Sequence, residues 1–259
     1  MEDNWLSQIT AEHETRGSKM VISGSEGVGK PSTIANMHDP LFMVTKGEQS
    51  LGALQRSGQI PETPSFGSFQ DWVDVKSALR ELLGAEKKPN ILAIDAADGF
   101  EHLVWDFVVK TKFGGNLSKA NDYGQGWKHV QHEWREFLDL LDQLTRKGIH
   151  VVLIAHLEVK RFIDPENVDY DRWQPALNKS VWALTGRWAD HVLQLSYFTH
   201  VVDGERGSRA KARGTSERVV YCTPSPTRVT KNRLGLNESY SLGMSPQAAA
   251  EVLNSLLFS

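Results

Sequence analysis

The sequence predicts an α/β protein in which helices flank a mostly parallel sheet. Short apolar runs at residues 19–23, 40–45, 90–95 and 149–155 alternate with segments of helical periodicity. Such alternation is typical of parallel strands joined by crossover helices. Two later runs, at 191–202 and 218–223, are expected to pair as antiparallel strands at an edge toward the C-terminus, around a connection rich in glycine and arginine.

Helices are expected where apolar residues recur every three or four positions. Ser68 is expected to cap one whose inward residues begin at Trp72. Two stretches are expected to be loops, namely residues 112–126 and the charged segment that follows His156. The remaining predicted helices cover residues 100–108, 127–147, 178–188 and 246–258.

Composition favours a soluble protein of the cytoplasm with an ordinary core. The chain has 259 residues, of which 40% are hydrophobic and 24% charged, with a net charge of -3 and a single cysteine, Cys222. This balance excludes a general attraction to nucleic acid or anionic membrane, so any such contact needs a local patch. We expect a polar N-terminal segment at 1–18, one domain at 19–245 and a C-terminal helix at 246–259, with no membrane partner.

One motif between a predicted strand and a predicted helix points to nucleotide binding. The stretch GSEGVGK places Gly24, Gly29 and Lys30 in the pattern G-x-x-x-x-G-K-[ST]. Backbone N–H groups of such a loop surround phosphate oxygens, and the lysine reaches the β and γ phosphates of ATP. The alternative is a simple glycine turn. The expected nucleotide contacts are Gly24, Ser25, Glu26, Gly27, Val28, Gly29, Lys30, Pro31, Ser32 and Thr33.

Pro31 departs from the motif, because it stands where a hydroxyl residue normally ligates Mg²⁺. Proline also lacks the N–H that contacts phosphate, although it is well tolerated in the first turn of a helix. We expect Ser32 or Thr33 to supply the hydroxyl, with Ser32 and Asp95 as the metal ligands. Phosphate binding is expected to be weakened but retained.

Two polar residues end apolar strands and are candidates for catalysis. Asp95 closes the run NILAID and can hold the water shell of Mg²⁺ beside the phosphates. His156 closes IHVVLIAH and can sense the γ-phosphate. The alternatives are an aspartate that serves a turn and a histidine that is bonded to a neighbouring loop.

Six stretches in order over residues 20–240 resemble the RecA-like, AAA-type P-loop ATPases of phages and prophages. They are GSEGVGK, ILAID, YGQGWKHVQHEWREFLDLLDQL, VVLIAHLEVKRF, NKSVWALTGRWADHVL and TKNRLGL. The resemblance implies a RecA-type core, ATP hydrolysis and a role in DNA recombination. It assigns phosphate binding to Gly24, Gly29 and Lys30, Mg²⁺ to Asp95, and a sensor position to His156. Where the family carries an acidic residue to position water, this chain has Lys46, with Glu48 as the nearby substitute.

A basic window at residues 206–233 contains eight arginines and lysines against one acid, Glu217. Such density fits a loop that contacts phosphate backbones of single-stranded DNA, with Arg209, Lys211 and Arg213 as candidates. A solvated basic loop is the alternative. Lys231 and Arg233, placed near the end of the core by the resemblance, are candidates for fingers that reach the nucleotide of a neighbouring subunit in a ring or filament.

Together these patterns predict an ATPase that uses Mg²⁺, in which Lys30, Asp95, Glu48 and His156 carry the chemistry. Two other functions stay open. One is a nucleotide-dependent scaffold that binds single-stranded DNA with little hydrolysis, which Pro31 and Lys46 favour. The other is a P-loop kinase, in which the arginine-rich segment covers an acceptor nucleotide.

Replacing Pro31 by serine tests whether the proline slows turnover. Pro31→Ser restores both a hydroxyl and an N–H, so we expect a rise in Mg²⁺-dependent phosphate release. The rate is measured at saturating ATP, with Pro31→Ala as the matched control that restores only the N–H. A folded Pro31→Ser protein that hydrolyses ATP more slowly than the unmodified chain would show that the proline belongs to a working site.

Overall fold

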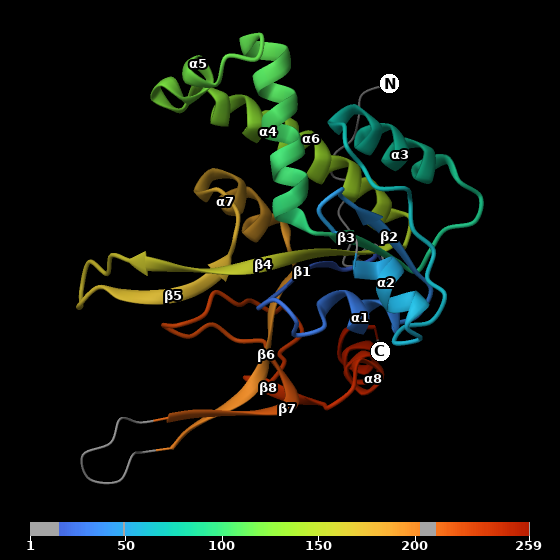
Figure 1. Ribbon diagram of the computed structural model, residues 1–259, viewed down its shortest axis with the longest axis vertical. Coiled ribbons are helices and arrows are strands. Elements are labelled where there is room, and N and C mark those ends of the chain that lie inside the picture. The colour runs from blue at the N-terminus through green and yellow to red at the C-terminus, as the bar shows by residue number, and fades with distance from the viewer. Residues whose placement is uncertain (1–15, 49, 203–210, 259) are drawn as a thin grey trace, which may run out of the picture.

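Eight strands form one sheet in the part of the chain that the computed structural model describes, residues 16–48, 50–202 and 211–258, with the backbone alone at 200–202 and 211–213 (Figure 1). The order is β2-β3-β4-β1-β6-β7-β8, and β5 pairs with β4. The central strands run parallel, whereas β5, β7 and β8 are antiparallel to their neighbours, which confirms the predicted fold class. The strands are β1 (Lys19–Gly24), β2 (Pro40–Val44), β3 (Ile91–Asp95), β4 (His150–Phe162), β5 (Tyr170–Pro175), β6 (His191–Val202), β7 (Lys211–Tyr221) and β8 (Ser239–Gly243).

Helices cover both faces of this sheet (Figure 1). A short helix and a turn, α5 (Leu117–Asn121) and η2 (Asp122–Gly124), connect α4 to α6. One face is covered by α3 (Trp72–Gly84), α4 (Ala97–Phe113), α6 (Gln125–Arg146) and α7 (Lys179–Trp188). The other is covered by α1 (Lys30–Ala35), α2 (Ser50–Arg56) and α8 (Pro246–Leu257).

The apolar strands divide their side chains between two cores. Val21 of β1 packs in the cluster under α3, α4, α6 and α7, whereas its neighbours Met20 and Ile22 pack in the cluster under α1 and α8. Successive residues of a strand point to opposite faces, so a strand covered on both sides is apolar throughout. This explains why β1 and β3 read as continuous hydrophobic runs in the sequence.

Indole rings anchor the helices of the first face to one another. Trp134 of α6 is fully buried, and its Nε1 donates to Oγ1 of Thr185 in α7 at 2.9 Å. The same ring stacks on Trp72 of α3 at 6.5 Å between centroids. A buried indole needs a partner for its N–H, and Thr185 supplies one.

Three sequence predictions about connections were wrong. The charged segment after His156 is not a loop, because β4 continues to Phe162 and pairs with β5 in a hairpin that projects from the sheet (Figure 1). Residues 112–126 include the end of α4 and all of α5. The strand β8 was not anticipated, and β7 already begins at Lys211, within the predicted connection. Half-exposed strands lack the apolar pattern that reveals buried ones.

The predicted cap of the helix at α3 was also wrong. Asp71, not Ser68, precedes its first turn, and Oδ1 of Asp71 accepts from the Val73 N–H at 2.9 Å. Ser68 lies in an extended stretch beside β2, where the Phe69 N–H donates to the Val44 carbonyl at 2.9 Å. Main-chain pairing along β2 therefore keeps the chain extended past the first residue that could have capped.

None of the helices in the described residues has both the length and the apolar character to cross a membrane.

Removing the cap is expected to lower stability. Asp71→Ala leaves an N–H of the first turn without its acceptor, so the free energy of unfolding should fall by about 1 kcal/mol. The matched control, Ser68→Ala, should leave it unchanged. Urea unfolding of both variants measures the difference, and an equal loss in the two proteins would contradict the assignment of Asp71 as the cap.

Candidate functional site

The stretch predicted to bind phosphate forms a tight turn between β1 and α1. Gly27 and Gly29 have φ of 75° and 91°, in the left-handed region that glycine adopts without strain. Gly24 is needed for space, because a Cβ there would lie 2.9 Å from the Leu195 carbonyl oxygen. The loop therefore combines a strand end, glycines with positive φ and a helix start, as the motif requires.

Lys30 spans the inside of this loop. It is only 4% exposed, and its Nζ donates to the carbonyls of Gly24 at 2.7 Å and Ser25 at 3.1 Å. Burial lowers the pKa of this ammonium, while the nearby Asp95 carboxylate acts in the opposite direction. The lysine is thus held at the place where phosphate oxygens would meet it.

The helix forms despite Pro31. The proline occupies the first turn, and the Thr33 N–H donates to the Gly29 carbonyl at 2.8 Å. The two hydroxyls expected to replace the missing one differ in position. Ser32 lines the cavity beside the loop, whereas Thr33 is fully buried and its Oγ1 has no hydrogen-bond partner among the described residues.

A cavity of about 330 Å³ adjoins the loop and gathers the predicted catalytic residues. Lys30, Glu48, Asp95 and His156, which come from four different places in the sequence, all line it. Lys46, which stands where the family carries an acidic residue, is not among the described residues that line the cavity. Glu48, its predicted substitute, does line it. The other residues that line the cavity are Glu26, Gly27, Gly29, Pro31, Ser32, Ser50, Leu54, Gln59, Arg218 and Pro246.

Among the acids that line this cavity, Asp95 has the most strongly shifted pKa. It is 3% exposed, and its Oδ2 has no hydrogen-bond partner among the described residues. Burial, helped by the nearby Glu48 carboxylate, raises the pKa of Asp95 to about 7, while Lys30 acts in the opposite direction. A buried carboxylate oxygen without a partner beside a second carboxylate fits a bound cation. Mg²⁺ at phosphate sites takes one or two carboxylates and completes its shell with water and substrate oxygens, so Asp95 and Ser32 fit as its ligands, with Glu48 nearby.

His156 is oriented by a residue that the sequence analysis missed. Its Nδ1 lies 2.9 Å from Oδ2 of Asp98, and its backbone N–H donates to Oδ1 of the same carboxylate at 3.3 Å. This side-chain hydrogen bond raises the pKa of His156. Burial opposes ionisation of Asp98, but the hydrogen bond from the histidine holds the pKa of Asp98 below its usual value. The available signal was the position of Asp98 in the first turn after the strand NILAID.

The other side of the imidazole faces Glu48. Nε2 of His156 lies 4.0 Å from Oε1 of Glu48. Asp98, His156 and Glu48 therefore form a chain that ends in the cavity. The predicted alternative to a sensor was a histidine bonded to a neighbouring loop, but its partner Asp98 lies in the first turn of α4. The sensor role of His156 stays a prediction, with Nε2 as the ring nitrogen that does not contact Asp98.

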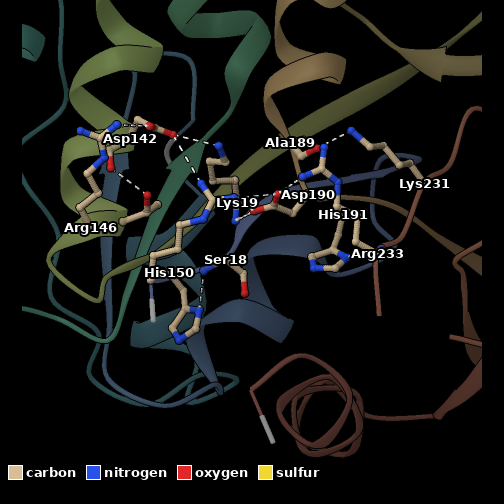
Figure 2. A network of polar contacts seen from close by, with 12 residues as sticks. Ser18, Lys19, Asp142, Arg146, His150, Ala189, Asp190, His191, Lys231 and Arg233 are labelled. Atoms are coloured by element: carbon tan, nitrogen blue, oxygen red, sulfur yellow. Dashed lines mark hydrogen bonds and ion pairs between the residues drawn. The ribbon is translucent and has the colours of Figure 1, made fainter. Parts of the chain in front are cut away.

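Lys231 and Arg233 lie at the opposite end of the central strands, where β1 and β6 begin (Figure 2). Nζ of Lys231 donates to the carbonyls of Ala189 at 2.6 Å and Gly186 at 3.1 Å. Arg233 contacts Oδ1 of Asp190 at 2.9 Å. Within one subunit they are thus far from the loop, and their role as fingers toward a neighbour stays a prediction.

The side chains of the candidate DNA contacts lie outside the described residues. Arg209 falls outside the described residues, and Lys211 and Arg213 are placed by backbone alone, opposite Val202 and His200 at the far end of the β6–β7 ribbon. Their strand projects from the sheet in the same direction as the β4–β5 hairpin (Figure 1).

Comparison with known proteins identifies the family. A family model described as an AAA domain matches residues 16–234, and the chain therefore belongs to this family. No curated protein matches the chain. Among solved structures, the chain is similar to the flagellar accessory protein FlaH from Methanocaldococcus jannaschii, with a TM-score of 0.44 and 10% identity over 96% of this chain and 95% of that one.

The buried acid makes stability depend on pH in a defined direction. Because the pKa of Asp95 is about 7 in the folded chain, above its ordinary value of 3.8, protonated Asp95 stabilises the fold at low pH, and this contribution is lost as pH rises from about 4 through 7. Asp95→Asn, without nucleotide or Mg²⁺, should therefore be more stable than the unmodified protein at pH 8 by on the order of 1–3 kcal/mol, with a smaller difference at pH 5. Urea unfolding at the two pH values measures this. The control is Asp139→Asn at an exposed position of α6, and a difference that does not change with pH would contradict the assignment.

Proposed function

We propose that this member of the AAA domain family binds ATP with Mg²⁺ and hydrolyses it, as a phage-type ATPase of DNA recombination or replication. The observation that carries the proposal is the meeting of Lys30, Asp95, Glu48 and His156 at one cavity beside a glycine loop. A nucleotide-binding ATPase is what the family and the RecA-like P-loop fold support. The phage setting and the DNA partner rest on the sequence resemblance.

The phosphates of ATP would bind to the N–H groups of the loop and to Lys30. Nζ of Lys30 now contacts two carbonyls of its own loop, so it would exchange the contacts with Gly24 and Ser25 for phosphate oxygens. Asp95 and Ser32 would hold Mg²⁺. When bound, this ion neutralises the charge that develops on the phosphate oxygens.

Water would attack the γ-phosphorus while the bond to the bridging oxygen breaks, and ADP and phosphate would be released. Glu48 positions the water and accepts its proton, since its carboxylate lines the cavity. His156, fixed by Asp98, lies 4.0 Å from Glu48 and keeps this carboxylate in place. Positioning rather than covalent chemistry is what phosphoryl transfer demands of a protein.

The projecting β4–β5 hairpin supports single-stranded DNA as the partner. The β4–β5 hairpin carries Arg172 over the Phe162 ring at 4.2 Å on one face, and the exposed Trp173 and Arg161, which contacts Asp169, belong to the other face. Aromatic and basic side chains in one place suit stacked bases and a phosphate backbone. The same strand β4 ends its buried part at His156, so a ligand on the hairpin is joined to the cavity by one strand.

The second candidate is a scaffold that binds ATP and DNA with little hydrolysis. Pro31 favours it, because position 31 offers neither the hydroxyl nor the N–H of the usual motif. Ser32 is the described hydroxyl of this turn that lines the cavity. Rates of phosphate release therefore decide between the two functions.

Mutations are expected to affect ATP binding and ATP hydrolysis separately. Lys30→Ala should weaken ATP binding by about 1–3 kcal/mol, the range for a hydrogen bond to a charged group. Glu48→Gln should bind ATP normally but release phosphate on the order of 10²-fold more slowly, because it loses the proton acceptor. Titration calorimetry and phosphate release, each with and without single-stranded DNA, measure these effects.

The control is Lys112→Ala at an exposed position of α4. Unchanged affinity in folded Lys30→Ala would contradict the phosphate-binding loop. Tight binding without release by the unmodified chain would favour the scaffold, and transfer of phosphate to an added nucleotide would favour a kinase.

A further inference from the structure

A tyrosine and an arginine from the antiparallel part of the sheet contact the phosphate-binding loop. Tyr197 of β6 and Arg218 of β7 are direct cross-strand partners, and the guanidinium lies 5.4 Å from the centre of the tyrosine ring. The strand pairing shifts register on both sides of this pair, after Tyr197 in β6 and after Arg218 toward β8. Such irregularities redirect side chains out of the regular alternation of a strand.

Both side chains donate to carbonyls of the loop. The Tyr197 hydroxyl donates to the Gly27 carbonyl at 2.9 Å, and Nε of Arg218 donates to the Val28 carbonyl at 2.8 Å. A second nitrogen of the guanidinium donates to the carbonyl of Met244, just after β8. Two successive carbonyls of the loop are thus held by residues about 170 and 190 positions away in the sequence.

These contacts determine where the loop's N–H groups point. In a planar trans peptide the N–H lies opposite to the C=O of the same unit. Holding the carbonyls of Gly27 and Val28 against the β6–β7 ribbon therefore directs the N–H groups of Val28 and Gly29 away from that ribbon. The Val28 N–H makes only a long bond of 3.4 Å, to the Ser25 carbonyl.

The hydrogen bonds from Tyr197 and Arg218, together called the clamp, act on residues that would otherwise rotate easily. Gly27 and Gly29 both have positive φ, and glycine gives little intrinsic resistance to rotation of the peptide units beside it. Arg218 also packs on Gly29, since a Cβ there would lie 3.3 Å from its Nε. Finally, Arg218 lines the cavity itself and adds a positive charge beside the place expected for phosphates.

We propose that Tyr197 and Arg218 are positioning residues that hold the loop's amides in the orientation that binds nucleotide phosphates. This inference rests on the proposed function. Preorganisation of donors lowers the cost of ordering them when the anion binds. The pair therefore contributes to ATP affinity, whereas Lys30, Asp95 and Glu48 meet the nucleotide, the metal and the water.

Variants of the pair test the proposal against a matched pair in the same sheet. Tyr197→Phe removes only the hydroxyl, Arg218→Gln removes the charge and the fork of donors, and Arg218→Lys retains the charge alone. The controls are Tyr221→Phe and Arg228→Gln, which alter a second arginine–tyrosine contact, with the guanidinium carbon 3.6 Å from the ring centre. Neither side chain hydrogen-bonds to the loop in the described part of the chain. Amide hydrogen exchange of residues 25–30 without nucleotide is measured beside ATP affinity and phosphate release.

We expect Arg218→Gln to weaken ATP binding about tenfold to a hundredfold and Tyr197→Phe about threefold to tenfold. Arg218→Lys should lie between the unmodified protein and Arg218→Gln. Exchange of the loop amides should become faster in the Tyr197 and Arg218 variants and not in the controls, and KM should change much more than kcat. If Arg218→Gln does not fold, Tyr197→Phe carries the same test.

The outcomes separate this inference from the proposed function. Loop exchange and ATP affinity within twofold of the unmodified protein in both variants would overturn the positioning role. Equal effects in the control pair would overturn it as well, because they would reflect a general loosening of the sheet. If the unmodified chain binds no ATP, the proposed function fails, and faster loop exchange in Tyr197→Phe would still support the clamp.

Discussion

The placement of β4 between β1 and β3 is the constraint on which the site depends. Parallel pairing sets Gly24 opposite His156 on one side and Ile94 opposite Leu153 on the other. Strands two positions apart in a sheet are separated by about 10 Å. The glycine loop and Asp95 therefore leave a gap at this edge, and β4 fills it with His156. A different register would move the histidine to the other face or away from the loop.

The same edge brings together charges that a folded protein normally keeps in water. Lys30 and Asp95 are both buried, and burial shifts each pKa toward the neutral form. Oδ2 of Asp95 has no hydrogen-bond partner among the described residues. Under the proposed function, phosphate oxygens and a divalent cation would complement these charges, since buried charges are stable when paired. Burial of these charged groups therefore lowers the stability of the unliganded protein.

At the opposite end of the central strands, where β1 and β6 begin, the charged groups are paired with one another. There Asp190 accepts hydrogen bonds from the Lys19 backbone, Arg16 and Arg233, and Nζ of Lys19 donates to Asp142 at 2.9 Å (Figure 2). These charges are partnered within the chain and join the starts of β1 and β6 to α6. Satisfied polar networks rigidify their surroundings. The central strands are therefore fastened where they begin, whereas Oδ2 of Asp95 and Oγ1 of Thr33, two buried oxygens without a partner among the described residues, lie at the end with the loop.

Local patterns in the sequence determined the buried strands, most helices and the glycine turn that is proposed to bind phosphate, because apolar runs, periodicity and glycine spacing act over a few residues. They also identified Lys30, Asp95 and His156, which end or follow such strands. Only the tertiary structure decided that the half-exposed segment after His156 pairs as a hairpin. It alone revealed Asp98, 58 residues before His156, and Arg218, 190 residues after Val28. Contacts over such separations follow from how the sheet is ordered, and no short stretch of sequence encodes that order.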